Sequence, residues 1–111
     1  MDSNNPSKVL GKAFLNAGDI MGLTLSELSQ TINCDISQLN QIAPKSNEGT
    51  RAIYFIRLYK KLYELLNGDE EEMKLWMKGY NTGTCGIPSQ QLQESDTDGL
   101  KHVMEYLEAL P

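Results

Sequence analysis

The chain has 111 residues, of which 40% are hydrophobic, and its formal net charge is −5 at pH 7. This length bounds the protein to one ordinary domain or two small helical units that share a core, and the hydrophobic content excludes disorder of the whole chain. Acidic residues outnumber basic ones both before and after Ser46, whereas surfaces that bind DNA through counterion release are rich in Lys and Arg.

Several classes of protein are disfavoured by what the sequence lacks. It has no run of 18 apolar residues and no basic and apolar leader, so we expect a cytoplasmic protein with no contact to a membrane. Cys34 and Cys85 lie far apart, and His102 is the only histidine, on the polar side of its predicted helix. A metal site would need about four ligands at short intervals. We therefore expect no metal, no cofactor and no enzymatic activity.

The first unit, residues 1–46, has the pattern of a helix-turn-helix bundle. Apolar residues recur at helical spacing over residues 7–21. Thr24 and Glu27 then form the T-x-x-E pattern of a capping box, in which each side chain satisfies an otherwise unpaired backbone N–H. This pattern predicts a second helix over residues 24–32.

A third helix is expected over residues 35–42, after a short turn, and two short helices this close together are typical of a helix-turn-helix. The later helix of such a pair enters the major groove of DNA. Its polar side chains are the candidates for DNA contact: Ser37, Gln38, Asn40 and Gln41. Asn and Gln can pair with adenine edges, but the segment contains no Lys or Arg to hold phosphates, so we expect weak binding to operator DNA.

The second unit, residues 47–111, begins after a polar break that contains Pro44. Its first helix, over residues 49–66, is apolar around well beyond one third of its circumference. A helix of this kind is central to the core or shared with a partner. We therefore predict a homodimer. The candidate interface residues are Tyr54, Leu58 and Leu65.

The rest of the second unit is also expected to be helical. Asp69 opens a helix whose first turn holds three acids, residues 70–72, where the helix dipole favours negative charge. Its apolar face is Met73, Trp76, Met77 and Tyr80. A glycine-containing turn and a short helix that starts at Pro88 follow. The last helix carries apolar residues at spacings of three and four from Leu100 to Leu110, so the fold class is all-α.

A series of landmark residues follows in order along residues 50–110. They are Arg57-Leu58-Tyr59, Leu66-Asn67-Gly68-Asp69, Trp76, Asn81, Gly83, Gly86, Pro88, Gly99-Leu100 and Tyr106-Leu107. In this order, and at nearly these spacings, they closely resemble the C-terminal toxin-binding domain of the Xre/MbcA/ParS antitoxins. Residues 22–42 are similar to the Xre-like helix-turn-helix that precedes this domain in the same family. Arg57 matches a family arginine, and in this chain it is expected either to solvate the exposed side of its helix or to pair with acids of the next helix.

The resemblance implies an antitoxin of a type II toxin–antitoxin pair. Its partner would be a RES-domain toxin that consumes NAD, or a related ADP-ribosylating toxin, whose active site the C-terminal unit occludes. The helix-turn-helix would repress the antitoxin's own operon. The candidate toxin-binding residues lie at the end of the last helix: Glu105, Tyr106, Leu107, Glu108 and Leu110. We expect a fragment of residues 50–111 to neutralise the toxin by itself. The alternative is a stand-alone helix-turn-helix transcriptional regulator whose C-terminal unit only dimerises.

Overall fold

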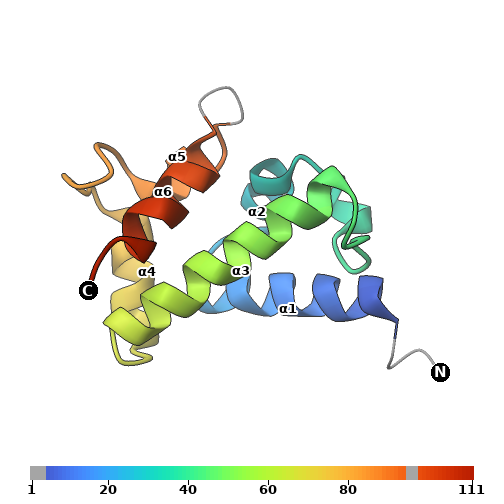
Figure 1. Cartoon of the computed structure of the whole chain (residues 1–111), viewed down its shortest axis with the longest axis horizontal. Coiled ribbons are helices and arrows are strands. Elements are labelled where there is room, and N and C mark those ends of the chain that lie inside the picture. Colours follow the sequence, from blue (N-terminus) through green and yellow to red (C-terminus); the bar gives the residue numbers. More distant parts are fainter. Residues whose placement is uncertain (1–4, 95–97) are drawn as a thin grey trace.

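The computed structural model describes residues 5–94 and 98–111, and this part of the chain is all-helical (Figure 1). The elements in order are α1 (Pro6–Ile20), α2 (Leu25–Ile32), the 3-10 turn η2 (Ile36–Gln38), α3 (Asn47–Leu65), α4 (Glu70–Lys78), α5 (Pro88–Gln91) and α6 (Gly99–Glu108). The predicted all-α class is confirmed for these residues. None of these helices is both long enough and apolar enough to cross a membrane.

Helix α3 is the element on which the others pack. It runs through the middle of the molecule in Figure 1, and it contacts α1, α2 and α6. Its buried side chains include Ala52, Phe55, Leu58 and Leu62. The ring of Phe14 in α1 meets the ring of Phe55 edge to face, with the ring centroids 5.0 Å apart. The wide apolar arc of α3 is therefore covered largely by helices of the same chain.

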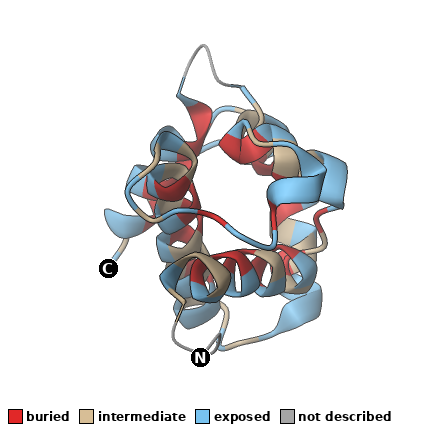
Figure 2. Ribbon diagram, turned by 90° about the vertical axis from the view of Figure 1, so that its right-hand side faces the viewer, coloured by how far each residue is buried: buried red, intermediate tan, exposed pale blue. Residues whose placement is uncertain are grey.

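The two predicted units share one hydrophobic core. The buried stretches of the helices face inward in Figure 2, and a single cluster of buried residues extends from Leu10 of α1 to Leu107 of α6. The predicted boundary after Ser46 coincides with the start of α3 at Asn47. Because α3 packs on α1 and α2 as well as on α6, a fragment of residues 50–111 would expose core side chains that α1 covers.

Side-chain caps define where the helices begin. Thr24 Oγ1 accepts a hydrogen bond from the Glu27 N–H at 3.1 Å, and Glu27 Oε1 accepts one from the Thr24 N–H at 2.9 Å. The predicted capping box of α2 is thus confirmed. Asn5, Ser46 and Asp69 cap α1, α3 and α4 with side-chain oxygens. The predicted acidic first turn of α4 is also confirmed.

The predicted helix over residues 35–42 is not formed. Only Ile36–Gln38 is helical, as a single 3-10 turn, and Asp35 makes no side-chain cap. The chain beyond this turn packs on α1 instead. The Ile42 N–H donates to the Ser7 carbonyl at 3.0 Å, and a Cβ on Gly11 would lie 2.5 Å from the carbonyl carbon of Asn40. This tertiary contact fixes a backbone path that an α-helix through residue 42 would not follow, so α2 is followed by a turn and not by a second α-helix.

Glu27 also links α2 to α4, because its carboxylate accepts hydrogen bonds from Lys78 Nζ at 3.0 and 3.1 Å. Burial raises the pKa of the Glu27 carboxyl, but the hydrogen bonds from Thr24 and Lys78 and the charge of Lys78 together lower it by more. The pKa therefore lies below its ordinary value of 4.5. A carboxyl whose pKa is lowered by folding stabilises the fold above its unfolded-state pKa, and this contribution is lost as the pH falls through the folded-state pKa.

We therefore expect a pH-dependent effect of the substitution Glu27→Gln. Urea unfolding should show a lower free energy of unfolding for the variant than for the wild type at about pH 6, and the difference should shrink as the pH falls below the ordinary carboxyl pKa of 4.5 and Glu27 takes up its proton. Glu64→Gln, on an exposed position of α3, is the matched control. A difference between Glu27→Gln and the wild type that stays constant over this range would contradict the assignment.

Candidate interaction surface

A tight turn over residues 81–86, which we call the 81–86 turn, leads from α4 toward α5. The backbones of Asn81 and Gly86 pair in both directions, with N–O distances of 2.8 and 3.1 Å. Inside the turn, Asn81 Oδ1 accepts a hydrogen bond from the Thr84 N–H at 3.0 Å, and Cys85 adopts a left-handed φ of 62°. These contacts satisfy polar groups of the turn internally, so the turn has a defined shape.

Thr84 attaches the 81–86 turn to α5 and α6. Its side chain is buried, and its carbonyl oxygen accepts hydrogen bonds from Gln91 Nε2 at 2.6 Å and from His102 Nε2 at 3.0 Å. A carbonyl oxygen only accepts, so Nε2 of His102 carries a proton in this contact. The predicted exposed position of His102 on α6 is confirmed. In addition, this side chain holds the turn, which the sequence pattern did not indicate.

Gly83 allows the side chain of Tyr106 to lie against the 81–86 turn. A Cβ on Gly83 would overlap the ring and the hydroxyl oxygen of Tyr106, so only glycine fits here without a shift of the ring. Tyr106 is half-buried and packs against the core. The turn and the neighbouring side of α6 therefore form one surface.

The five predicted toxin-binding residues differ in their exposure. Glu105 and Glu108 are exposed, whereas Tyr106 and Leu110 are half-buried and pack against the core. Leu107 is fully buried, because it belongs to the apolar face of α6 that packs on α3. Its side chain is therefore not available to a partner while α6 is folded. A deletion of residues 105–111 would remove this core side chain together with the surface.

Glu108 is paired with Arg57 of α3. Arg57 Nη2 lies 2.7 Å from Glu108 Oε1, and Arg57 Nε lies 3.1 Å from Glu108 Oε2, so the ion pair is bidentate. The two alternatives predicted for Arg57 were solvation of its helix and pairing with acids of the next helix, but its partner is on α6. The two side chains are 49% and 34% exposed, so the pair contributes about 0–1 kcal/mol to stability. The charge of Glu108 is thus neutralised by Arg57 of the same chain, whereas Glu105 has no ion-pair partner among residues 5–94 and 98–111.

The predicted DNA-binding residues lie on η2 and the turn after it. All four are exposed: Ser37, Gln38, Asn40 and Gln41. They occupy a 3-10 turn and irregular backbone, not successive turns of an α-helix, so they do not form the row of side chains that a recognition helix places in a major groove.

The predicted dimer-interface residues on α3 are covered by the chain itself. Leu58 is fully buried, and Tyr54 and Leu65 are half-buried and pack against the core. Leu58 cannot contact a second copy, because α3 is central to the core of one protomer. In the part of the chain that the structure describes, the most exposed large apolar side chains lie outside α3: Val9, Leu25, Leu75 and Tyr80.

Tyr80 is a surface residue that the sequence pattern misplaced. Helical spacing put it on the apolar face of α4 with Met73 and Met77, both of which are buried. However, α4 ends at Lys78, and Gly79 has extended backbone, so Tyr80 leaves the helical face and is 69% exposed. Gly79 was the signal that could have indicated this, since glycine commonly stands where a helix ends.

The remaining candidate groups are possible metal ligands and the two cysteine thiols. Within the two described ranges, no group of three or more His, Cys, Asp or Glu side chains could hold a metal ion. Cys34 and Cys85 are free thiols. Burial raises the pKa of the Cys34 thiol, and the charges of Glu48 and Asp35 raise it further, which disfavours the reactive thiolate.

The 81–86 turn and the outer side of α6 thus offer an unmatched carboxylate, Glu105, and the exposed part of Tyr106 on a fixed support, with Tyr80 directly before the turn. Tyrosine side chains supply contact area at protein interfaces, and charged groups supply orientation. No protein-family model matches the chain, and no curated protein matches it either.

Proposed function

We propose that this chain is the antitoxin of a type II toxin–antitoxin pair and that it neutralises a RES-domain, NAD-consuming toxin by covering the toxin's active site. The proposal rests on the resemblance of residues 50–110 to the Xre/MbcA/ParS antitoxins. One structural observation carries it further: the landmark residues build a single module on α3. As an antitoxin, the protein acts in the cytoplasm with its toxin.

Four of the landmark residues have a structural reason in this module. Asn81 and Gly86 close the 81–86 turn, and Gly83 accommodates Tyr106. Gly99 lies directly against the carbonyl group of Gln91, at the junction of α5 and α6. Residues that are scattered in the sequence therefore support one exposed surface, as expected for a domain whose task is to present that surface to a partner.

The exposed end of α6 also suits an active site that binds NAD. Such a site must hold two phosphate groups, for which arginine side chains are well suited. Glu105 can approach these cations, because its charge is not matched within the described part of the chain. Glu108 is held by Arg57 and contributes less. We therefore assign the electrostatic part of toxin binding mainly to Glu105, and the apolar part to Tyr106 and Leu110.

The test is co-expression of the full chain with its cognate toxin, with cell growth and NAD content as readouts. The full chain is used because the two halves share one core. Glu105→Lys should abolish rescue and weaken toxin binding at least about tenfold, because it places a positive charge opposite the arginine side chains of the toxin's active site. Glu64→Lys makes the same charge change on an exposed position of α3 and should keep rescue. Full rescue by a folded Glu105→Lys, Tyr106→Ala double variant would refute active-site occlusion by this surface.

Repression of its own operon through DNA binding is part of the proposal, and it leads to a prediction about salt. With about two to four phosphate contacts per protomer, affinity for operator DNA should fall about ten- to a hundredfold between about 50 and 200 mM salt. Fluorescence anisotropy measures this directly. Replacing Ser37, Gln38 and Asn40 by Ala should weaken binding more than Gln90→Ala, an exposed control on α5. Nanomolar binding by the free protein at physiological salt would contradict the prediction.

The alternative, a stand-alone transcriptional regulator, needs a recognition helix that reads DNA with high affinity. The corresponding segment is a single 3-10 turn, and residues 33–42 contain no Lys or Arg. These observations favour the protein-binding function over the alternative.

A further inference from the structure

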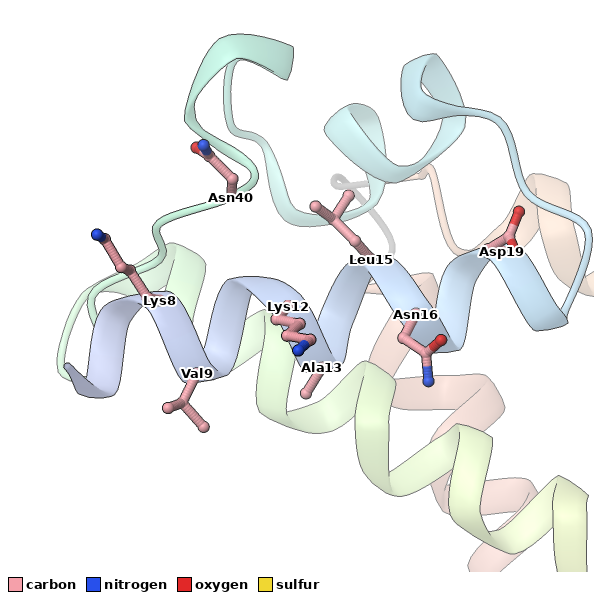
Figure 3. A pocket seen from close by; sticks show the side chains of 8 residues that line it. All are labelled: Lys8, Val9, Lys12, Ala13, Leu15, Asn16, Asp19 and Asn40. Atoms are coloured by element: carbon pink, nitrogen blue, oxygen red, sulfur yellow. The ribbon is translucent and has the colours of Figure 1, made fainter. Parts of the chain in front are cut away.

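The outer face of α1 is a shallow, open hollow of about 1130 Å³. Val9, Ala13 and Asn16 follow one another at spacings of four and three residues, and they project from one side of α1 in Figure 3. Val9 is 54% exposed, and the small side chain of Ala13 leaves room above the helix between its neighbours. This face is apolar at its centre, and Val9, Ala13 and Asn16 are all exposed.

Lys12 gives the same face a positive charge. It lines the hollow next to Ala13, is exposed, and has no ion-pair partner in residues 5–94 and 98–111. Asp19 lines the hollow seven residues further along α1, toward the end of the helix. A partner for this face should therefore bring an apolar side chain for the centre and a carboxylate for Lys12.

The outer face of α4 has these two features. Glu71 and Leu75 are four residues apart on this helix, so they lie on one face, and Glu72 is beside them. All three are exposed, and the Leu75 side chain is 66% exposed, so this face of α4 offers an apolar side chain beside two carboxylates. Leu75 therefore offers an apolar side chain that suits the apolar centre of the hollow on α1. The carboxylates of Glu71 and Glu72 beside it have the charge opposite to that of Lys12.

We infer that the outer face of α1 binds the outer face of α4 of a second copy of this chain. Each protomer carries both faces, and α1 contacts α4 within one protomer. Two copies related by a twofold axis can thus make the contact twice, with Leu75 of each copy against Ala13 and Val9 of the other. The homodimer interface then lies on α1 and α4, not on α3. This inference does not depend on the toxin.

The test is a charge-swap experiment on the full chain, followed by sedimentation velocity at about 1–100 μM. The wild type should dimerise. Lys12→Glu and Glu71→Lys should each raise the dimer dissociation constant at least about tenfold, and the double variant should return it to within about threefold of the wild type. Lys60→Glu, which reverses an exposed charge on α3, should leave the constant unchanged. Leu75→Ser should give a folded monomer, because this side chain is not part of the core.

Three results would overturn the inference. The first is a wild type that stays monomeric throughout the concentration range, even if the α1 face then proves to bind a different protein. The second is a dimer that survives Leu75→Ser but is lost on substitution of Ile53 or Tyr63, exposed residues of α3. The third is a double variant, Lys12→Glu with Glu71→Lys, whose dimer dissociation constant is as high as those of the single variants.

Discussion

Replacing Phe14 by Ala is expected to lower the free energy of unfolding by about 3–5 kcal/mol. Phe14 is fully buried and packs edge to face against Phe55, so its removal leaves a cavity between α1 and α3. Because small domains have a total stability of about 5–15 kcal/mol, the variant should be only marginally folded.

The same variant tests whether both halves unfold together. Trp76 is the only tryptophan and lies in α4, so its fluorescence reports on the second half, while far-UV circular dichroism reports on all helices. In urea the two signals should give one coincident transition, shifted to lower urea in Phe14→Ala. Leu25→Ala, at an exposed apolar position of α2, should shift it little. A Trp76 transition that stays in place while helical signal is lost would show two independent units.

Gly99→Ala is expected to lower the free energy of unfolding by about 3 kcal/mol. This is near the upper end of the range for substitutions that add atoms to a well-packed core. A Cβ at this position would overlap the backbone carbonyl of Gln91, and a backbone group cannot rotate aside as a side chain can. The start of α6 would have to separate from α5. Since Gln91 also donates to the Thr84 carbonyl, the 81–86 turn should shift as well.

Gly79→Ala is the matched control for this experiment. A Cβ on Gly79 would lie 3.2 Å from the Leu75 carbonyl oxygen, and the site is exposed with a negative φ. Urea unfolding should therefore show a change below about 0.5 kcal/mol. If Gly99→Ala were equally mild, α5 and α6 would not be held in the close contact described here.

The individual helices could be predicted from the sequence because the signals for them are local. The capping box at Thr24 and the cap at Asp69 mark the starts of α2 and α4, and apolar spacing marks α1, α3 and α6. The expected helix over residues 35–42 failed for a non-local reason. Its backbone is held by Ser7 and Gly11 on α1, about 30 residues earlier, and no local pattern encodes that contact.

The candidate site was predictable only in part, since exposure depends on tertiary packing. The pattern placed Glu105 and Tyr106 on the last helix and Leu107 on its apolar face, but it could not tell whether Leu107 packs on α3 of the same chain or on a partner. It also could not find the Arg57 and Glu108 pair, whose members are 51 residues apart. The apolar arc of α3 indicated a covered helix, but a sequence cannot say whether its cover comes from the same chain or from another.

The shared core has a consequence for how long the chain would survive proteases in a cell. Proteases cut chains that open, and if the shared core unfolds as one cooperative unit, opening of the core by loss of α1 also releases α6. No stable fragment would then remain to hold a toxin. If the chain is the antitoxin proposed above, the lifetime of the N-terminal half therefore sets the lifetime of toxin inhibition, and a protease needs access to only one segment to free the toxin.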